Sequence, residues 1–177
     1  MRKVKIMDKE TVMRSLARIT HEILERNDDS LCILGVKTRG IRLSRILTEN
    51  LKKFAGLDVP CGYIDATMYR DDFTQEEKRR KVGESLVPCD INGKTVLIVD
   101  DVLYTGRTAR AAIEAIFALG RPKAVRLAVL VDRGHREVPV RPDFVGKNIP
   151  TSRQEKIAVV MDGEDADCGV FIVNDAE

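Results

Sequence analysis

The chain has 177 residues, of which 44% are hydrophobic and 33% charged, and this composition describes a soluble globular protein in which residues 1–177 form one domain. It contains no run of about 18 apolar residues and no apolar segment near its N-terminus, which excludes a membrane-spanning helix and a recognisable signal peptide. Its four cysteines are scattered without a C-x-x-C pair, so we expect buried thiols in a reducing cytoplasm rather than disulfides or zinc ligands.

The net charge of +2 is unevenly distributed along the chain. From Met161 onward there are six acidic residues and no lysine or arginine, so residues 1–160 carry a net charge of +8. An excess of this size permits an anionic partner but does not identify one.

The first predicted elements are a short strand over Val4–Met7 and a helix that runs from the N-cap Asp8 to about Asn27. Apolar residues recur at helical spacing along one face of that helix: Val12, Leu16, Ile19 and Ile23. Basic side chains lie mostly away from this stripe: Arg14, Arg18, His21 and Arg26. From the residues alone, a solvated helix face is the favoured interpretation of that group.

A second strand, Leu31–Val36, leads into a polar turn and another amphipathic helix. The turn consists of Lys37, Thr38, Arg39 and Gly40. Backbone N–H groups at a helix N-terminus, together with an arginine fork, can bind an anion, although such a turn is weak evidence by itself.

Tyr63–Met68 alternates in polarity and predicts a strand. Residues 69–83 are highly charged and poor in apolar side chains, so we expect a mobile surface loop there.

The most informative stretch is residues 94–119. A buried strand over Val96–Val99 precedes two acids, a turn-prone loop ending at Thr108, and an amphipathic helix that stops at Gly120. A loop at the carboxyl end of a strand and the N-terminus of a helix is where open α/β sheets bind phosphates. Neither a Walker A loop nor a G-x-G-x-x-G fingerprint is present.

The two acids, Asp100 and Asp101, give this predicted phosphate site a second character. A carboxylate beside a phosphate is repulsive unless something lies between them, and ribose hydroxyls suit an acceptor-only group. The stretch therefore predicts a site for a ribose 5-phosphate.

Arg126–Val131 predicts another buried strand, and residues 132–152 follow without a sustained period. An irregular stretch of this length inside a compact domain is usually functional or disordered. Ile157–Met161 and Val170–Val173 predict closing strands.

Val96–Thr108 resembles the phosphoribosyl pyrophosphate (PRPP) signature of the type I phosphoribosyltransferases. The resemblance implies an α/β fold with a mostly parallel central sheet, flanking helices and a base-binding hood. It assigns the lid to residues 69–83, because Tyr69–Asp72 matches the mobile catalytic loop of the pyrimidine branch, and the hood to residues 132–152.

The resemblance also implies a role for each part of the site. The PRPP and UMP site comprises Asp100 and Asp101 for the ribose hydroxyls, with Val102, Leu103, Tyr104, Thr105, Gly106, Arg107 and Thr108 around the 5-phosphate. Lys37 to Gly40 would bind pyrophosphate. The catalytic residues would be Arg39, Arg70, Asp100 and Asp101, and the base-binding residues Arg133, Phe144, Val145 and Lys147. Mg²⁺ would be carried by PRPP rather than held by a protein cage.

Tyr104 bears on the choice of base. Purine enzymes of this family commonly have an aspartate at that position, and a tyrosine is a poor acid or base near pH 7. The expected reaction is therefore uracil plus PRPP giving UMP and pyrophosphate, with a hypoxanthine or guanine phosphoribosyltransferase as the alternative.

The similarity covers almost the whole chain and is greatest to the branch whose members also bind attenuator stem-loops in pyrimidine messages under the control of UMP. The implied RNA face comprises Arg14, Arg18, His21, Arg26, Lys147 and Arg153, with Lys156 as a further candidate. A regulator with vestigial catalysis remains open. The family also implies a homo-oligomer.

Overall fold

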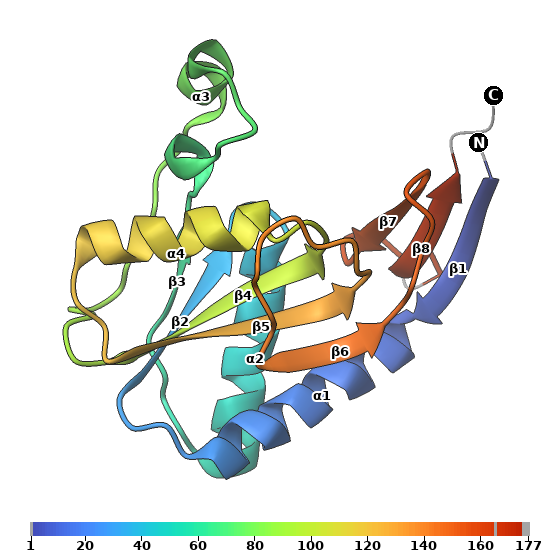
Figure 1. Cartoon of the computed structure of the whole chain (residues 1–177). Helices are drawn as coiled ribbons and strands as arrows, with labels where there is room; N and C mark the ends of the chain where they lie inside the picture. The colour runs from blue at the N-terminus through green and yellow to red at the C-terminus, as the bar shows by residue number, and fades with distance from the viewer. Residues whose placement is uncertain (1, 165, 175–177) are drawn as a thin grey trace.

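A five-stranded parallel sheet forms the centre of the protein (Figure 1). The computed structural model describes residues 2–164 and 166–174. The strand order is β3-β2-β4-β5-β6, with bounds β2 (Leu31–Val36), β3 (Cys61–Ile64), β4 (Thr95–Leu103), β5 (Ala124–Asp132) and β6 (Phe144–Asn148). Because β3 and β4 lie on opposite sides of β2, the chain reverses its direction of winding there. This switch point is where open α/β sheets bind ligands.

Helices cover both faces of this sheet (Figure 1). On one face lie α1 (Lys9–Arg26) and α2 (Gly40–Ala55), and on the other lies α4 (Arg107–Leu119). The predicted first helix is confirmed: its apolar stripe is buried, and the Asp8 side chain accepts the Thr11 N–H at 2.8 Å. The predicted α/β architecture, with a mostly parallel central sheet between layers of helices, is confirmed.

A second, antiparallel sheet lies beyond the carboxyl ends of β4 to β6 (Figure 1). Its order is β1-β8-β7, with bounds β1 (Arg2–Asp8), β7 (Glu155–Val160) and β8 (Gly169–Asn174). We call it the hood sheet. The two strands predicted near the C-terminus are β7 and β8, which pair with each other, and β8 also pairs with the N-terminal strand β1.

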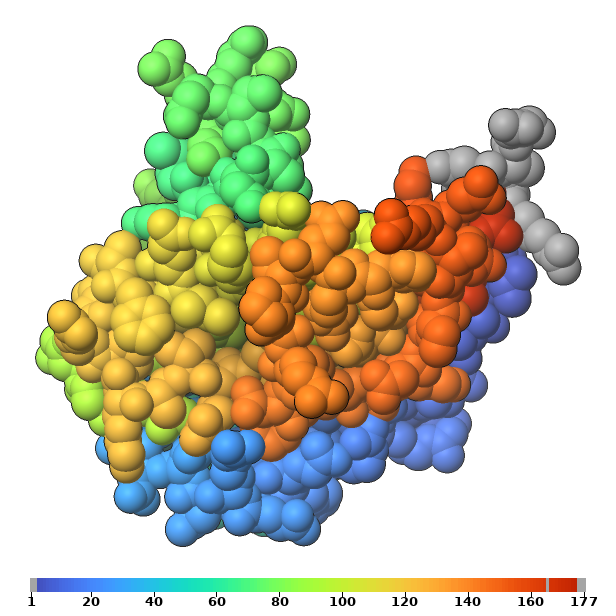
Figure 2. Space-filling view, in the orientation of Figure 1, coloured from blue at the N-terminus to red at the C-terminus, as the bar shows by residue number. Residues whose placement is uncertain are grey.

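The connection between β3 and β4 projects from the body, and the space-filling view shows a hollow between this projection and the hood sheet (Figure 2). We call residues 67–83 the lid; it contains η1 (Thr67–Tyr69) and α3 (Gln75–Lys81). The expected strand ends at Ile64, before Met68, and the expected loop contains a helix. The reason is local, because Thr74 and Glu77 form a capping box although the helix has no buried side chain.

Two other boundaries differ from expectation. The strand predicted to end at Val99 continues through both acids to Leu103. The irregular stretch 132–152 contains β6, which pairs in parallel with β5 as the edge strand of the main sheet. Among the helices of the described residues, none is long and apolar enough to cross a membrane.

Candidate functional site

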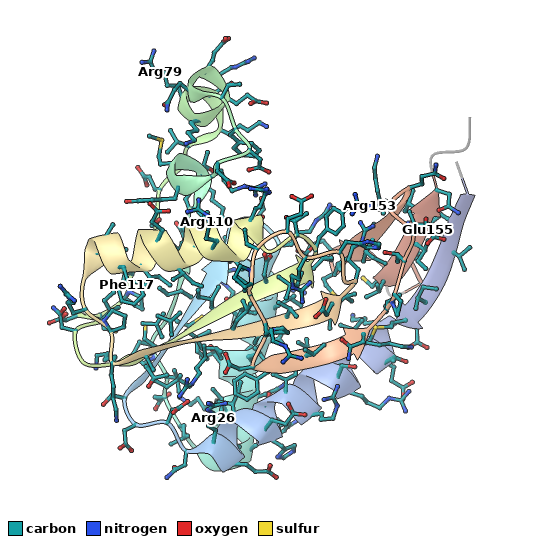
Figure 3. All side chains as sticks on the ribbon, viewed as in Figure 1. Arg26, Arg79, Arg110, Phe117, Arg153 and Glu155 are labelled. Atoms are coloured by element: carbon teal, nitrogen blue, oxygen red, sulfur yellow. The ribbon has the colours of Figure 1, made fainter. Side chains whose placement is uncertain are left out.

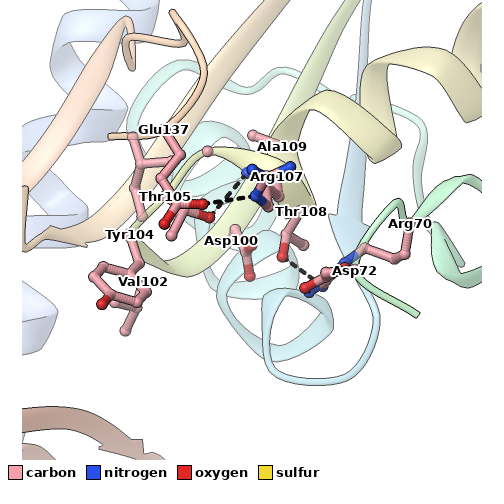
Figure 4. Close-up of a pocket in the computed structure, with 12 residues that line it drawn as sticks. Arg70, Asp72, Asp100, Val102, Tyr104, Thr105, Arg107, Thr108, Ala109 and Glu137 are labelled. Atoms are coloured by element: carbon pink, nitrogen blue, oxygen red, sulfur yellow. Dashed lines mark hydrogen bonds and ion pairs between the residues drawn. The ribbon is translucent and has the colours of Figure 1, made fainter. Parts of the chain in front are cut away.

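A cavity of about 290 Å³ opens where β4 passes into α4 (Figure 4). Its walls are Arg70, Asp72, Asp100, Val102, Leu103, Tyr104, Thr105, Gly106, Arg107, Thr108, Ala109 and Glu137. It therefore contains eight of the nine residues assigned to the PRPP signature, and the ninth, Asp101, lies outside it.

The floor of this cavity is the N-terminus of α4. Gly106 is its N-cap, with φ of 88°, and no side chain caps the helix. The Arg107 N–H donates to Thr105 Oγ1 at 3.3 Å, the next N–H groups of this turn are left for another acceptor, and the helix dipole favours an anion there. Thr105 and Thr108 bring hydroxyl groups to the same wall. This arrangement is suited to a phosphate.

The two acids point in different directions, because neighbouring residues of an unbroken strand face opposite sides of the sheet. Asp100 lines the cavity, whereas Asp101 lies 3.5 Å from Arg39, in the turn between β2 and α2. Burial, and then the negative charge of Asp101, raise the pKa of Asp100 well above its usual value. The Asp101 N–H donates to Asp100 Oδ1 at 2.9 Å and partly offsets this effect.

A second cavity, of about 260 Å³, adjoins the first. It is lined by Val36, Lys37, Thr38, Asp65, Ala66, Thr67, Arg70, Phe73, Lys81 and Thr108. The peptide bond between Lys37 and Thr38 is cis. Arg70 and Thr108 belong to both cavities and are joined by a hydrogen bond of 2.6 Å, so they form the partition between them.

The beginning of the lid is attached to α4 by three arginines. Arg70 donates to Thr108 and pairs with Asp72, as Figure 4 shows, and Arg107 pairs with Asp71. Arg110 donates to the Tyr69 carbonyl, and Figure 3 places its side chain beneath the lid. Arg70 holds the pKa of Asp72 below its usual value, mainly through their hydrogen bond. Asp71 and Asp72 of the lid thus form ion pairs with two arginines that line the first cavity.

The predicted hood, residues 132–152, does not act as one unit. Its first part lies on the loop between β4 and α4. Arg136 donates to the Tyr104 carbonyl, and the Glu137 N–H donates to the Thr105 carbonyl at 2.9 Å. Glu137 also pairs with Arg107 at 2.7 Å. This part of the chain braces the loop that the sequence assigned to the 5-phosphate.

The expectation that Phe144 stacks on a bound base is wrong. Its side chain is only 5% exposed and packs in the core beneath α1, and Phe144 pairs with Ala128, four residues before the carboxyl end of β5. Val145 also lies within the sheet, where its carbonyl accepts from Arg18, and Lys147 is exposed. The sequence pattern could not show this, because it gave no sign of β6.

Arg133 is the one predicted base-binding residue that reaches the site. It is 6% exposed, and its guanidinium lies 4.0 Å from the centre of the Tyr104 ring. It also donates to Thr151 Oγ1 at 2.9 Å and to the Ser152 carbonyl at 2.9 Å. Arg133 therefore connects Tyr104 to the segment that leads into the hood sheet.

The hood sheet borders a third cavity, of about 310 Å³. Thr38, Arg39 and Arg42 form one wall, and Val159, Val160, Met161 and Asp162 form the other. Sequence reasoning missed this wall, as it missed Asp65 and Glu137. No motif marks any of these residues, and only the folding of distant segments onto one sheet edge brings them together.

The basic residues of α1 are engaged within the protein. Arg18 donates to the Gly146 carbonyl and pairs with Glu22, Arg14 pairs with Glu10, and Arg26 pairs with Asp143. His21 stacks on the Phe54 ring at 4.9 Å.

These contacts bring α1 and β6, and hence Lys147, onto one surface. Arg153, by contrast, lies just before β7, well apart from Arg26 in Figure 3. The six predicted RNA-binding residues therefore do not form one compact patch.

Comparison with known proteins agrees with this geometry. A sequence model of the phosphoribosyl transferase domain matches residues 5–163. Bifunctional protein PyrR of Caldicellulosiruptor bescii is 49% identical over 169 residues, covering 94% of this chain and 93% of that protein. The protein of the same name from Thermus aquaticus is 51% identical over 168 residues, covering 92% and 93%.

Solved structures support the fold. A hypoxanthine-guanine phosphoribosyltransferase from Bacillus anthracis superposes with a TM-score of 0.66 at 20% identity, over 83% of this chain and 82% of that one. At such low identity the likeness concerns the fold alone. The domain match and the near full-length relatives together show that this chain is a phosphoribosyltransferase and belongs, within that family, with the proteins named Bifunctional protein PyrR.

Proposed function

We propose that the protein transfers the ribose 5-phosphate of PRPP to uracil, giving UMP and pyrophosphate. One observation carries this proposal: two cavities lined by cationic side chains adjoin at the carboxyl edge of the main sheet and share Arg70 and Thr108. PRPP has a phosphate at one end of its ribose and a pyrophosphate at the other. A pair of connected cavities suits a substrate of that shape.

Different residues of the two cavities would bind different parts of PRPP. The N-terminus of α4 would hold the 5-phosphate, and Asp100 would accept hydrogen bonds from the ribose hydroxyls. Lys37 and Thr38 would hold the pyrophosphate, with Arg70 between the two groups. Arg39, held near Asp101, would neutralise charge on the leaving group from the side of the third cavity.

In the proposed reaction, the base nitrogen displaces pyrophosphate from the anomeric carbon through an oxocarbenium-like transition state. The protein would act by positioning the reactants and by stabilising charge as pyrophosphate leaves. The lid would exclude water, which competes with the base for the ribose.

Mg²⁺ bound to PRPP supplies positive charge to the leaving pyrophosphate. Within residues 2–164 and 166–174, no three His, Cys, Asp or Glu side chains gather into a metal site. Asp100, whose carboxylate lines the first cavity, fits a metal ion that keeps water and substrate oxygens as its main ligands.

The preference for uracil rests on Tyr104. Arg133 covers one face of its ring, and His135 meets the ring edge-on with centroids 5.9 Å apart. These contacts hold the tyrosine ring in place. Purine enzymes of this family commonly carry an aspartate at this position, and the tyrosine provides no such acid for a purine N7. We propose that Tyr104, with the chain that leads into β7, bounds the base.

The enzymatic proposal is tested with purified protein, PRPP and Mg²⁺. We expect UMP from uracil and little or no IMP from hypoxanthine. Formation of IMP without UMP would overturn the pyrimidine assignment, and formation of neither would overturn the activity itself.

We also propose UMP-dependent binding to the leader RNA of a pyrimidine operon, because the chain belongs with proteins that are named as bifunctional. The surface that fits best is formed by α1 and β6, where Arg14 and Lys147 are exposed and Arg18 joins the two elements. Cations on such a surface can neutralise RNA phosphates.

Filter binding to a pyrimidine leader stem-loop, with and without UMP, tests the RNA proposal. We expect UMP to strengthen binding and Arg14→Ala to weaken it about threefold to tenfold. Arg79→Ala removes the same charge from the tip of the lid, far from α1 in Figure 3, and serves as the control. Salt-sensitive binding that ignores both RNA sequence and UMP contradicts the proposal.

A further inference from the structure

Both ends of the lid meet at one side chain. Asp65 follows β3, and its Oδ1 accepts the Thr67 N–H at 2.8 Å. Its Oδ2 accepts the Gly83 N–H at 2.9 Å, where the chain returns from the lid. A single carboxylate therefore binds the first and last residues of the lid.

An ammonium group approaches the same carboxylate from the turn formed by residues 37–40, which we call the pyrophosphate turn. Lys37 Nζ lies 3.8 Å from Asp65 Oδ2, and both residues line the second cavity. The Asp65 side chain is only 6% exposed, whereas that of Lys37 is 37% exposed. Burying a carboxylate this deeply is unfavourable without compensating contacts, and Asp65 has two N–H donors and one nearby ammonium.

Gly83 makes this arrangement possible. A Cβ at position 83 would overlap Lys37 Nζ and lie 2.9 Å from Asp65 Oδ2. The absence of a side chain at the returning end of the lid thus leaves room for the ammonium of Lys37. The lid and the pyrophosphate turn are fitted to each other at this point.

We propose that Asp65 is a positioning residue, which ties both ends of the lid to Lys37 so that closure of the lid and placement of the ammonium are one event. Asp65 acts through Lys37 and through the lid backbone, without contacting the reacting atoms. The proposal rests on the proposed function, since it takes the second cavity as the pyrophosphate site.

Asp65→Asn is the first test. An amide oxygen can accept one of the two N–H groups, but its NH₂ would face the other donor and leaves Lys37 without a counter-charge. We expect KM for PRPP to rise about ten- to a hundredfold and KM for uracil to change less than about twofold.

The matched control is Asp90→Asn. Asp90 is exposed in the turn before β4, and its carboxylate accepts the Asn92 N–H at 2.9 Å. The same change of charge at a comparable turn should leave both KM values at those of the wild type.

The lid itself provides a readout that does not need catalysis. Lys78, Arg79, Arg80 and Lys81 follow one another in α3, so trypsin can cleave there. We expect Asp65→Asn to be cleaved about tenfold faster than the wild type, because the lid opens more often when its hydrogen bonds to Asp65 are weakened. Pyrophosphate with Mg²⁺ should protect the wild type more than the variant.

Gly83→Ala provides a second route should Asp65→Asn fail to fold, since it displaces Lys37 while keeping the carboxylate. It should raise KM for PRPP and hasten cleavage in the same way. Combining Asp65→Asn with Lys37→Met should raise KM for PRPP little beyond the effect of Lys37→Met alone, because Asp65 is proposed to act on PRPP through Lys37.

The proposal is overturned if Asp65→Asn, or Gly83→Ala in its place, retains the KM for PRPP and the cleavage rate of the wild type. It is also overturned if KM rises equally for both substrates. If the wild type forms neither UMP nor IMP, the proposed function fails, and the cleavage rates still decide whether Asp65 anchors the lid.

Discussion

At the scale of single residues, the two adjacent acids of β4 perform different tasks. Asp100 lines the first cavity and carries a raised pKa, whereas Asp101 faces Arg39, which lines the third cavity. A ligand that brings hydroxyl donors or positive charge to Asp100 would therefore favour the ionised form of this carboxyl group.

This division predicts that Asp100→Asn is more stable than the wild type at neutral pH but catalytically impaired. The folded pKa of Asp100 lies above 3.8, so its ionisation disfavours folding at high pH and has no such effect below 3.8. The gain in Tm should be a few degrees at pH 8, since about 1 kcal/mol shifts Tm by about 2–4 °C in a domain of this size. It should shrink as the pH falls towards 4, while UMP formation drops about a hundredfold.

Thermal melts across this pH range, with Asp101→Asn as the partner variant, provide the measurement. Asp101→Asn breaks the contact with Arg39 and should show no gain in stability. A gain for Asp100→Asn that is equal at pH 4 and pH 8 would contradict the account given for its pKa.

At the scale of elements, α1 is joined to the edge strand β6 through Arg18, whose guanidinium donates to the carbonyls of Val145 and Gly146. We expect Arg18→Ala to lower the free energy of unfolding by about 1–2 kcal/mol through these hydrogen bonds. Arg14→Ala, which removes only an exposed pair with Glu10, should change it by less than about 0.5 kcal/mol.

Chemical denaturation of the two variants tests this difference. It also decides how an RNA experiment is interpreted, because a loss of binding in Arg18→Ala then includes a loss of α1–β6 contact. Equal stability of both variants would show that Arg18 is not a structural link.

The elements that the sequence predicted well are those with a periodic apolar face. The α1 stripe and the buried strands β2 and β5 follow from their own residues. β6 escaped prediction because it is a short edge strand, with one buried glycine and two exposed polar residues among its five.

The candidate site was predictable only where one continuous motif carries it. The loop from Asp100 to Thr108 lies at the cavity, as its spacing indicated. Phe144 was misplaced because the strand around it was not recognised. Asp65 carries no sign of its role, since its three partners come from residues 37, 67 and 83 and meet only in the folded chain.

At the scale of the whole molecule, the hood sheet and the main sheet share one core. Val170 of β8 is fully buried in the same cluster as Val99 of β4 and Leu130 of β5. We therefore expect the two sheets to unfold together, in one cooperative transition. Val170→Ala should lower the Tm of the whole protein by several degrees, because it leaves a cavity costing about 1–3 kcal/mol in that core.

Calorimetry and circular dichroism of the wild type and Val170→Ala provide this test. Coincident transitions that move together in the variant are the expected result. A separate early transition, with the main sheet unaffected by Val170→Ala, would show that the hood sheet unfolds on its own.

The hood sheet also brings the two ends of the described chain together, since Arg2 pairs with Asn174 across β1 and β8. A short linker could therefore circularise the backbone, which could then be reopened within the exposed helix α3. Such a permutant would keep every strand pairing while dividing the lid into two separate arms. Covalent topology, rather than side-chain chemistry, would then reveal whether the lid must be continuous to close.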